Sequence, residues 1–330
     1  MRLRAYKNMA VTPLGIGLAA LGRPGYITLN HRDDLPSTDR AAMQQHAYDV
    51  LDAAWDAGIR YFDVARSYGL GEKFLAAWIQ SRHITPIELT VGSKWGYTYT
   101  ADWQTEADQH EVKDHGLEAL KRQWEESYAL LGEHLGLYQI HSVTPDSPVL
   151  NDDAVLNELL RLKLEFNLSL GLTLSGPKQA DVLLQALEIK YGDAPLFDSV
   201  QATWNLLEPS AAHALTAAHI SGLVVIVKEA LANGRLTPRA AVDESFAANY
   251  VLLQAQAERL ETTIDGLCIA AALDQNWAGV VLSGAATVQQ LQSNAQALNV
   301  QWDEEAAAAL SRIAEPAEEY WRRRSKQSWN

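Results

Sequence analysis

Eight short runs of apolar and β-branched residues recur along the chain, and each is followed by a longer stretch with helical spacing. Short strands with so few polar residues are typical of parallel strands that are buried on both faces. Eight of them, each followed by a helix, within 330 residues predict an α/β fold of the (β/α)8, or TIM, barrel type. The expected strands are 14–18, 60–62, 89–92, 137–140, 170–174, 199–202, 223–227 and 280–282.

Capping residues indicate where the helices between these strands begin and end. Ser37 or Thr38 is expected to cap a first helix that Gly58 closes. The chain contains no linker rich in proline, glycine or serine, so a single domain is expected over residues 1–330. We expect a lead-in strand before the buried strand at 13–18, and a helix and tail at the C-terminus.

A doubly wound parallel sheet is the alternative fold. It requires a glycine-rich phosphate loop after an early strand and an acidic residue about 20 positions later. Residues 15–25 read "GIGLAALGRPG", which is rich in glycine but lacks the G-x-G-x-x-G order. No amphipathic helix follows directly, so the barrel is favoured.

Composition excludes several classes of partner. The formal net charge is −14 and the isoelectric point is near 5.1, which argues against nucleic acid and anionic membranes as partners. Cys268 is the single cysteine, so an intramolecular disulfide and a cysteine-based metal cluster are impossible. The basic, apolar start resembles a signal peptide, but Asn8 and Pro13 interrupt it. No stretch approaches the roughly 20 apolar residues of a membrane span, and we expect a soluble, cytoplasmic protein.

Four residues with chemical potential follow three consecutive expected strands. Asp63 comes directly after the strand at 60–62, and Tyr68 lies in the loop beyond it. Lys94 follows the third strand and His141 the fourth. Each residue alone has an ordinary structural explanation as a turn cap, a strand end or a core histidine. The barrel, however, gathers the carboxyl ends of its strands at one rim, where active sites form.

This set suits proton transfer to or from a carbonyl oxygen. A phenol has an ordinary pKa of about 10 and is a weak acid at neutral pH. A nearby ammonium from Lys94 is expected to lower the pKa of Tyr68, while Asp63 holds Lys94 charged and aimed. A neutral His141 would orient the carbonyl. Hydride must come from a cofactor, because no side chain supplies one, and no ligand cluster suggests a metal.

With these residues in place, the chain resembles the aldo-keto reductases. The resemblance implies a (β/α)8 barrel that binds an extended nicotinamide dinucleotide, with Tyr68 as general acid/base, Lys94 and Asp63 tuning it, and His141 orienting the carbonyl. The "GLTLSGPKQ" stretch is similar to sugar (aldose or galactose) dehydrogenase-like members. The matching blocks are "FDVARSYGLGE" at 62–72, "SK" ending at Lys94, "QIHS" around His141, "QATWNLLE" at 201–208, "ALANGRLT" at 230–237 and "SGAATVQQLQSN" at 283–294.

The resemblance also assigns a cofactor site, with departures. Gln201 and Thr173 match residues that hold the carboxamide of the nicotinamide, but the asparagine that usually follows the latter is Leu174, unless Ser175 replaces it. Lys228 stands where an aromatic residue often stacks on the nicotinamide. The full expected set is Thr173, Ser175, Gln201, Lys228, Glu229, Leu231, Asn233, Ser283, Gly284, Ala285, Ala286, Thr287, Gln290 and Asn294.

The adenosine end departs most clearly from the family pattern. Members that prefer NADP usually carry a cation for the 2′-phosphate. The two expected cation positions are Ala286 and Gln290, and the usual glutamate before Asn294 is Ser293. Losing a charge-assisted hydrogen bond typically costs about 1.5–3 kcal/mol. The sequence therefore predicts an NADP preference that is weakened or reversed toward NAD.

Aromatic residues suggest the substrate pocket. Trp95, Tyr97 and Trp103 lie in or next to the loop beyond the third strand, and Tyr26 lies in the insertion after the first. Their faces would suit a sugar ring or an aromatic carbonyl compound equally, and ordinary loop packing is the alternative. His31 in the insertion, and Trp321 and Trp329 in the tail, are further candidates. The three arginines at 322–324 are expected to form a solvated helix face.

The sequence thus predicts an NAD(P)(H)-dependent oxidoreductase that interconverts a carbonyl (aldehyde, ketone or sugar lactol/lactone) and an alcohol by hydride transfer. Its expected partner is a small-molecule substrate. The alternative is a nucleotide-binding regulatory module, or a catalytically weakened relative, that kept the barrel. The substitutions at Leu174, Lys228, Ala286 and Ser293 keep that alternative open.

Overall fold

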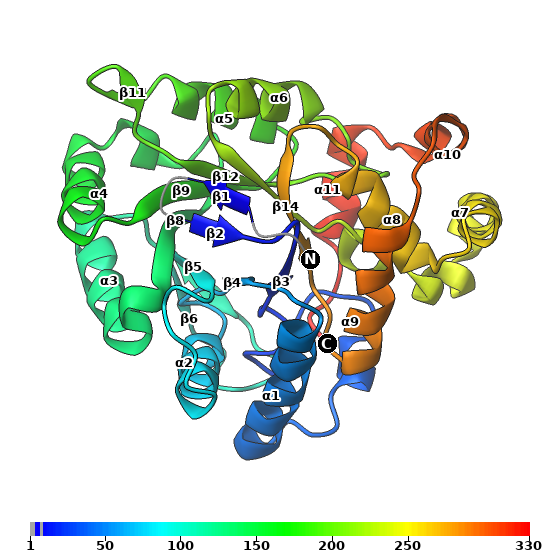
Figure 1. Ribbon diagram of the computed structural model, residues 1–330, viewed down its shortest axis with the longest axis horizontal. Coiled ribbons are helices and arrows are strands. Elements are labelled where there is room, and N and C mark those ends of the chain that lie inside the picture. Colours follow the sequence, from blue (N-terminus) through cyan, green and yellow to red (C-terminus); the bar gives the residue numbers. More distant parts are fainter. Residues whose placement is uncertain (1–3, 7–8) are drawn as a thin grey trace.

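A computed structural model of the chain describes residues 4–6 and 9–330 and contains a closed barrel of parallel strands (Figure 1). All eight strands lie where the sequence predicts them, so the (β/α)8 fold is confirmed. Around the barrel, neighbouring strands follow the chain order, and the last pairs with the first. The strands are β3 (Leu14–Gly17), β4 (Tyr61–Asp63), β5 (Thr90–Trp95), β8 (Leu135–Val143), β9 (Ser169–Leu174), β12 (Ser199–Thr203), β13 (Val224–Lys228) and β14 (Ala278–Ser283).

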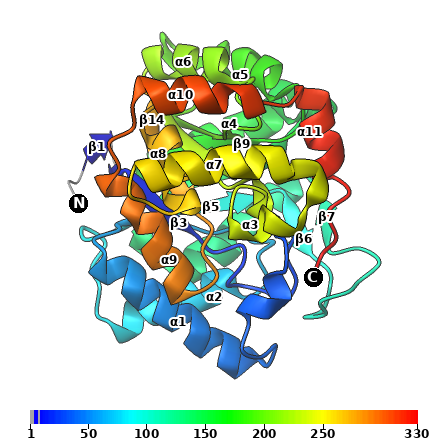
Figure 2. The same ribbon diagram turned by 90° about the vertical axis from the view of Figure 1, so that its right-hand side faces the viewer.

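Helices surround the barrel on its outer side (Figures 1 and 2). Asp39, rather than Ser37 or Thr38, caps the first helix, because its carboxylate accepts hydrogen bonds from the Ala41 and Ala42 amides at 2.9 and 3.1 Å. Within residues 4–6 and 9–330, no helix is long and apolar enough to cross a membrane. The α-helices are α1 (Arg40–Asp56), α2 (Gly71–Ser81), α3 (Leu117–Leu131), α4 (Asp153–Phe166), α5 (Gln179–Leu187), α6 (Ala212–Ile220), α7 (Ala247–Arg259), α8 (Ile264–Leu273), α9 (Val288–Ala295), α10 (Glu304–Leu310) and α11 (Ala317–Arg324).

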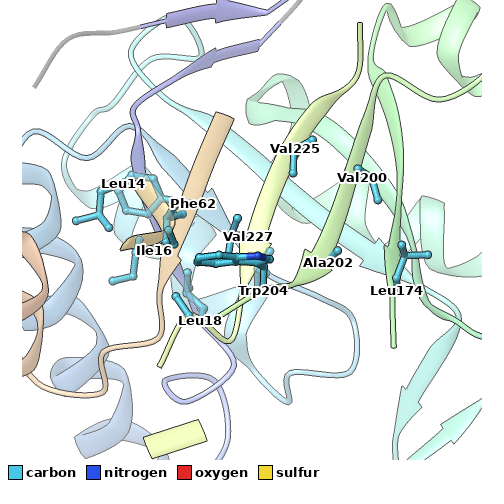
Figure 3. Packing of buried hydrophobic residues seen from close by; sticks show 14 of the residues in the cluster. Leu14, Ile16, Leu18, Phe62, Leu174, Val200, Ala202, Trp204, Val225 and Val227 are labelled. Atoms are coloured by element: carbon cyan, nitrogen blue, oxygen red, sulfur yellow. The ribbon is translucent and has the colours of Figure 1, made fainter. Parts of the chain in front are cut away.

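Each barrel strand contributes side chains to two apolar layers, because its successive side chains point to opposite faces. Phe62 of β4 and Val227 of β13 belong to the larger layer, in which the strands contact the helices (Figure 3). Tyr61 and Ile226, one residue away in each strand, belong to a smaller cluster inside the barrel. The barrel interior is therefore filled with side chains, and a ligand must bind at its rim.

A hairpin of β1 (Arg4–Tyr6) and β2 (Met9–Val11) lies across the amino-terminal end of the barrel. Met9 and Val11 join the interior cluster, and the Ala10 amide donates to Thr90 Oγ1 at the start of β5, at 3.2 Å. The antiparallel pair β6 (Tyr97–Tyr99) and β7 (Glu111–Lys113) and the C-terminal tail lie at the opposite end (Figure 2). Of the two ends of the barrel, the carboxyl-terminal one carries a pocket among the residues that the structure describes.

Two loops at this end are packed backbone to backbone. Gly22, in the segment after β3, accepts a hydrogen bond from the Leu70 amide at 2.8 Å. A Cβ atom at Gly22 would lie 2.2 Å from the Tyr68 carbonyl oxygen and 2.8 Å from the Gly71 amide nitrogen. Both contacts are with backbone, which cannot move aside as a flexible side chain can. The absence of a side chain at Gly22 therefore allows the loop that carries Tyr68 to take its position.

We predict that Gly22→Ala destabilises the protein by about 1–3 kcal/mol, the usual cost of overpacking a closed contact, and displaces Tyr68. Chemical unfolding would measure the first effect. Gly17→Ala is a matched control, because the nearest atom to its added Cβ is 3.8 Å away. Equal stability of the two variants would contradict the argument.

Candidate active site

A pocket of about 640 Å³ opens at the carboxyl ends of the strands. Strand ends form its floor, and the loops after β3, β13 and β14, the β6–β7 pair and the C-terminal tail form its walls. Of the residues expected in the site, the pocket is lined by Tyr26, Asp63, Tyr68, Tyr97, His141, Thr173, Ser175, Gln201, Lys228, Glu229, Leu231, Asn233, Ser283, Gly284, Ala285, Gln290 and Asn294.

A buried ion pair joins Lys94 of β5 to Asp63 of β4 at the floor. The two side chains are 1% and 2% exposed. The Lys94 ammonium also donates to the Val64 carbonyl oxygen at 2.9 Å. Burying such a pair is costly unless its remaining hydrogen-bonding capacity is satisfied.

The second carboxylate oxygen of Asp63 accepts three further hydrogen bonds. Tyr61 Oη donates at 3.2 Å, Gln139 Nε2 at 3.3 Å and Gln201 Nε2 at 2.9 Å. The Tyr61 ring fits only because Gly92 faces it: a Cβ there would lie 2.3 Å from Tyr61 Oη. Asp63 is thus held in one position, and it fixes Lys94 in turn.

Tyr68 lies directly beyond this ion pair. The Lys94 Nζ atom is 4.9 Å from the centre of the Tyr68 ring, and the His141 ring stands edge-on at 5.7 Å. Burial raises the pKa of the Tyr68 phenol, and the Asp63 carboxylate raises it further. The pKa of Tyr68 is thus raised rather than lowered as predicted, because burial and the Asp63 carboxylate dominate. This direction keeps the phenol protonated at neutral pH.

His141 is held as a neutral imidazole. Burial lowers its pKa well below 6.5, and the charges of Lys94, Lys228 and Arg23 lower it further. Its Nδ1 atom lies 3.5 Å from Ser67 Oγ, at the limit of a hydrogen bond. The sequence prediction of a neutral, hydrogen-bonding histidine beside the phenol agrees with this environment.

Polar side chains continue the site along β9 and β12. Thr173 Oγ1 accepts a hydrogen bond from the Ser142 amide at 2.7 Å, and Ser175 Oγ donates to Ser142 Oγ at 3.3 Å. Gln201, expected to hold a carboxamide, donates to Asp63 instead (see above). Leu174 is completely buried and faces away from the pocket, because it alternates with Thr173 and Ser175 along the strand.

A second charge cluster lies at the end of β13. Glu229 forms an ion pair with Arg324 of α11, at 2.6 Å, and Lys228 lies 3.7 Å from the same carboxylate. Burial raises the pKa of Glu229, but Arg324 and Lys228 outweigh it and bring that pKa to about 2. The arginines at 322–324 therefore do not form one solvated face: Arg322 and Arg323 are exposed, whereas Arg324 reaches into the pocket.

At the other end of the pocket, two buried side-chain oxygens have no hydrogen-bond partner. They are Oδ1 of Asn233 and Oδ1 of Asn294, and both residues line the pocket. The Asn294 amide donates to Ser283 Oγ at 2.8 Å, which fixes its orientation. Unpaired buried acceptors need a donor, so this end fits a ligand that presents N–H or O–H groups, as an extended dinucleotide does.

The same end contains a cation that the sequence argument missed. Arg239 lines the pocket and forms an ion pair with Asp34, and Gln290 Nε2 donates to the same Asp34 oxygen at 2.7 Å. Ala286 and Thr287 are not among the residues that line the pocket. The Ala286 amide donates a hydrogen bond to Gln290 Oε1 at 2.8 Å, and the Thr287 side chain caps α9. Arg239 lies two residues after the "ALANGRLT" block, so its closeness in sequence to a matched cofactor block is the signal that could have identified it.

The substrate end also differs from expectation. Trp95 and Trp103 lie outside the pocket: Trp95 alternates with Lys94 and packs behind the strand, and Trp103 contacts Phe74. Tyr26 and Tyr97 do line it. His31 is buried, and neither it nor Trp321 is among the lining residues.

Arg23 was missed by the sequence argument and is central to this end. Its guanidinium lies 5.2 Å from the Tyr68 ring and 4.6 Å from Trp329. It donates to the Ser67 carbonyl oxygen at 2.9 Å and pairs with Glu111 of β7. The arrangement leaves both a positive and a negative group lining the pocket beside the phenol.

The C-terminal tail closes the substrate end. Tyr26 and Asn330 exchange two backbone hydrogen bonds, at 3.1 and 3.2 Å. Trp329 stacks on His110, with ring centres 4.0 Å apart, and lines the pocket. Trp329 is thus the tail aromatic that reaches the site.

Comparison with curated proteins gives two informative relatives. D-threo-aldose 1-dehydrogenase of Pseudomonas sp is 40% identical over 80 residues, which cover 24% of this chain and 20% of that protein. The NADH-specific methylglyoxal reductase of Escherichia coli (strain K12) is 26% identical over 338 aligned positions, covering 94% of this chain and 97% of that protein.

Solved structures share the fold. The aldo-keto reductase AKR11C1 from Bacillus halodurans (holo form) superimposes with a TM-score of 0.73 at 21% identity, over 97% of this chain and 99% of that chain. A profile of the Aldo/keto reductase family matches residues 13–315. Because this match spans the barrel and both ends of the pocket, the chain belongs to the aldo/keto reductase family.

Proposed function

We propose that this protein reduces the carbonyl group of a small hydroxylated aldehyde or ketone, and oxidises the corresponding alcohol or lactol, with NAD(H) as its preferred cofactor. The family is one of NAD(P)H-dependent oxidoreductases that act on carbonyl and alcohol groups. The single observation that carries the proposal is the position of the Tyr68 phenol ring beside the buried Lys94–Asp63 pair and the His141 ring.

The residues divide the chemistry between them. The bound dinucleotide supplies or accepts the hydride at the carbonyl carbon. Tyr68 gives its phenolic proton to the carbonyl oxygen during reduction and takes it back during oxidation. His141, uncharged, donates a hydrogen bond that orients the same oxygen. Lys94 and Asp63 are positioning residues, and the Lys94 ammonium stabilises the phenolate that forms when the proton leaves.

Residues for the cofactor are present along the pocket. We assign Thr173, Ser175 and Gln201 to the nicotinamide end, since they lie on the strand ends nearest His141. Asn233 and Asn294, with their unpaired oxygens, belong to the adenosine end. The backbone of 283–285 lies between β14 and α9, where amides can hold a phosphate.

We predict that Tyr68→Phe lowers kcat for carbonyl reduction by about 10²–10⁴-fold, the usual contribution of a general acid, and leaves NADH affinity unchanged. Steady-state kinetics and fluorescence titration measure the two effects. Tyr191→Phe is a matched control, because Tyr191 is 56% exposed and lies outside the pocket, in the hairpin of β10 (Lys190–Tyr191) and β11 (Ala194–Pro195).

Normal turnover in Tyr68→Phe would refute the assignment of the acid. Tight NADH binding by the wild type, without turnover of any carbonyl in a broad panel, would instead favour a nucleotide-binding regulatory module.

The polar pair at the substrate end supports a hydroxylated substrate. Arg23 offers donors and Glu111 offers acceptors on the pocket wall, and the Tyr26, Tyr97 and Trp329 rings provide flat faces. Arg23 and Glu111 pair with each other, but Arg23 Nε is buried without a hydrogen-bond partner, and a hydroxylated substrate offers it an acceptor that the ring of an aromatic compound lacks. One relative is named for an aldose and another for methylglyoxal, a small dicarbonyl. We therefore favour aldoses and related hydroxycarbonyls.

We expect Glu111→Gln to raise KM for aldoses about tenfold, since hydrogen bonds to charged groups contribute about 1.5–3 kcal/mol. KM for methylglyoxal, which has no hydroxyl groups to reach Glu111, should change little. Parallel steady-state assays with both substrates give the comparison. An equal change for both would mean that Glu111 acts through Arg23 and Tyr68 rather than on the substrate.

The cofactor preference depends on Asp34. The cation Arg239 lines the pocket with Gln290 and Asn294, but it is paired with Asp34. The Asp34 side chain is only 7% exposed. A 2′-phosphate would have to compete with this carboxylate and would be repelled by it, whereas a ribose 2′-hydroxyl can donate to it. We therefore attribute the expected weakening of the NADP preference to an arginine, Arg239, that is already paired with Asp34, and not to the absence of a cation.

We predict that Asp34→Asn increases the affinity for NADPH relative to NADH by about tenfold or more, because it frees a charge-assisted bond from Arg239. Titrations with both dinucleotides measure the ratio. Asp33→Asn removes a neighbouring exposed carboxylate and is the control. An unchanged ratio in Asp34→Asn would exclude Arg239 from the 2′ position.

A further inference from the structure

Charged side chains around the pocket come in compensated pairs, with one exception among residues 4–6 and 9–330. Lys94 pairs with Asp63, Arg23 with Glu111, Arg324 with Glu229, and Arg239 with Asp34. The exception is Lys228, whose nearest carboxylate is already in use. The pocket therefore contains one ammonium without a counter-charge of its own.

The position of Lys228 is set by its strand. It ends β13 and is the register partner of Thr203 on β12, whose Oγ1 accepts a hydrogen bond from Lys228 Nζ at 2.9 Å. Glu229 Oε1 is 3.7 Å away but accepts hydrogen bonds from Arg324 at 2.6 and 2.9 Å. The Lys228 side chain is 15% exposed and lines the pocket.

Lys228 lies at the reacting end of the pocket rather than at the adenosine end. Thr203, to which it donates, is two residues beyond Gln201 on the same face of β12, and Gln201 donates to Asp63. The charge of Lys228 lowers the pKa of His141, and Lys94 in turn lowers that of Lys228. If the proposed function holds, the nicotinamide must lie at this end, because hydride has to reach the carbon of a carbonyl whose oxygen contacts Tyr68 and His141. Lys228 and the nicotinamide ring are then neighbours.

The two oxidation states of the nicotinamide differ in charge. The oxidised ring is a cation and the reduced ring is neutral, while the pyrophosphate is the same in both. An ammonium near the ring that shares its nearest carboxylate with Arg324 repels only the oxidised form, and repulsion between like charges is strong where water is largely excluded. Any contact of Lys228 with the rest of the dinucleotide changes the affinity of both oxidation states equally.

We propose that Lys228 makes this pocket bind the reduced dinucleotide in preference to the oxidised one, and so adapts the protein to carbonyl reduction. The overall equilibrium of the reaction is unchanged. The oxidised cofactor leaves more readily after each reduction and inhibits less, which favours net reduction when both forms are present. This inference rests on the proposed function and adds to it the direction of the reaction, which is carbonyl reduction.

The test compares dissociation constants in the wild type and in Lys228→Met. NADH is titrated by energy transfer from tryptophan, and NAD⁺ by its displacement of NADH. We expect the ratio of the NAD⁺ to the NADH dissociation constant to fall about tenfold in the variant, corresponding to about 1.4 kcal/mol, mainly through tighter NAD⁺ binding. Lys178→Met, which removes an exposed lysine between β9 and α5, is the control and should leave the ratio unchanged.

Other outcomes are distinct. If both dinucleotides weaken equally in Lys228→Met, the ammonium contacts the pyrophosphate and the inference is wrong. An unchanged ratio also overturns it. If the wild type binds neither dinucleotide at millimolar concentration, the proposed function itself fails. Lys228→Gln keeps a donor for Thr203 and replaces Lys228→Met should that variant fail to fold.

A pH titration of the wild type gives an independent measurement. Burial lowers the pKa of Lys228 to about 8, against the opposing effect of Glu229. The groups that face it are Glu229, Arg324 on α11, Lys94 on β5 and His141 on β8. The pKa of His141 is lowered well below 6.5. Between pH 7 and 9.5 Lys228 loses its charge, so NAD⁺ binding should strengthen relative to NADH. A ratio independent of pH would contradict the inference.

Discussion

The ion pair between Asp63 and Lys94 is the interaction on which the site depends. Both side chains are almost completely buried, so neither can be charged without the other. Tyr61, Gln139 and Gln201 supply the hydrogen bonds that fix the carboxylate in place. These residues come from three different strands, and the pair is therefore stable only when the barrel is closed. Folding and the positioning of the acid are one event.

The surroundings of Tyr68 have a chemical consequence. Because burial and the Asp63 carboxylate raise the pKa of Tyr68, the phenol remains a proton donor. In the proposed reduction it would lose its proton only as the carbonyl oxygen takes up negative charge. An acid that stays protonated until the transition state suits reduction better than one that is already ionised.

Periodicity and strand-end position allowed the barrel, and the gathering of Asp63, Lys94 and His141 around Tyr68, to be predicted, because both are encoded within a few neighbouring residues. The alternation of side chains also shows why Trp95 is not in the pocket: it follows Lys94 in the same strand and must face the helices. That error was avoidable. The position of Asp39 as the cap of α1, one residue beyond Thr38, shows the usual imprecision at element boundaries.

The three arginines of the pocket could not be predicted in the same way. Arg23 and Arg239 reach it from the segments after β3 and β13, and Arg324 from the end of α11; each finds its carboxylate on another segment. Where the end of a long side chain lies is not encoded in local periodicity, so only the folded chain shows which charge meets which. The same pairing explains why the number of positive residues near a pocket is a poor guide to its affinity for phosphate. What decides it is whether a carboxylate already holds each one, as Asp34 holds Arg239.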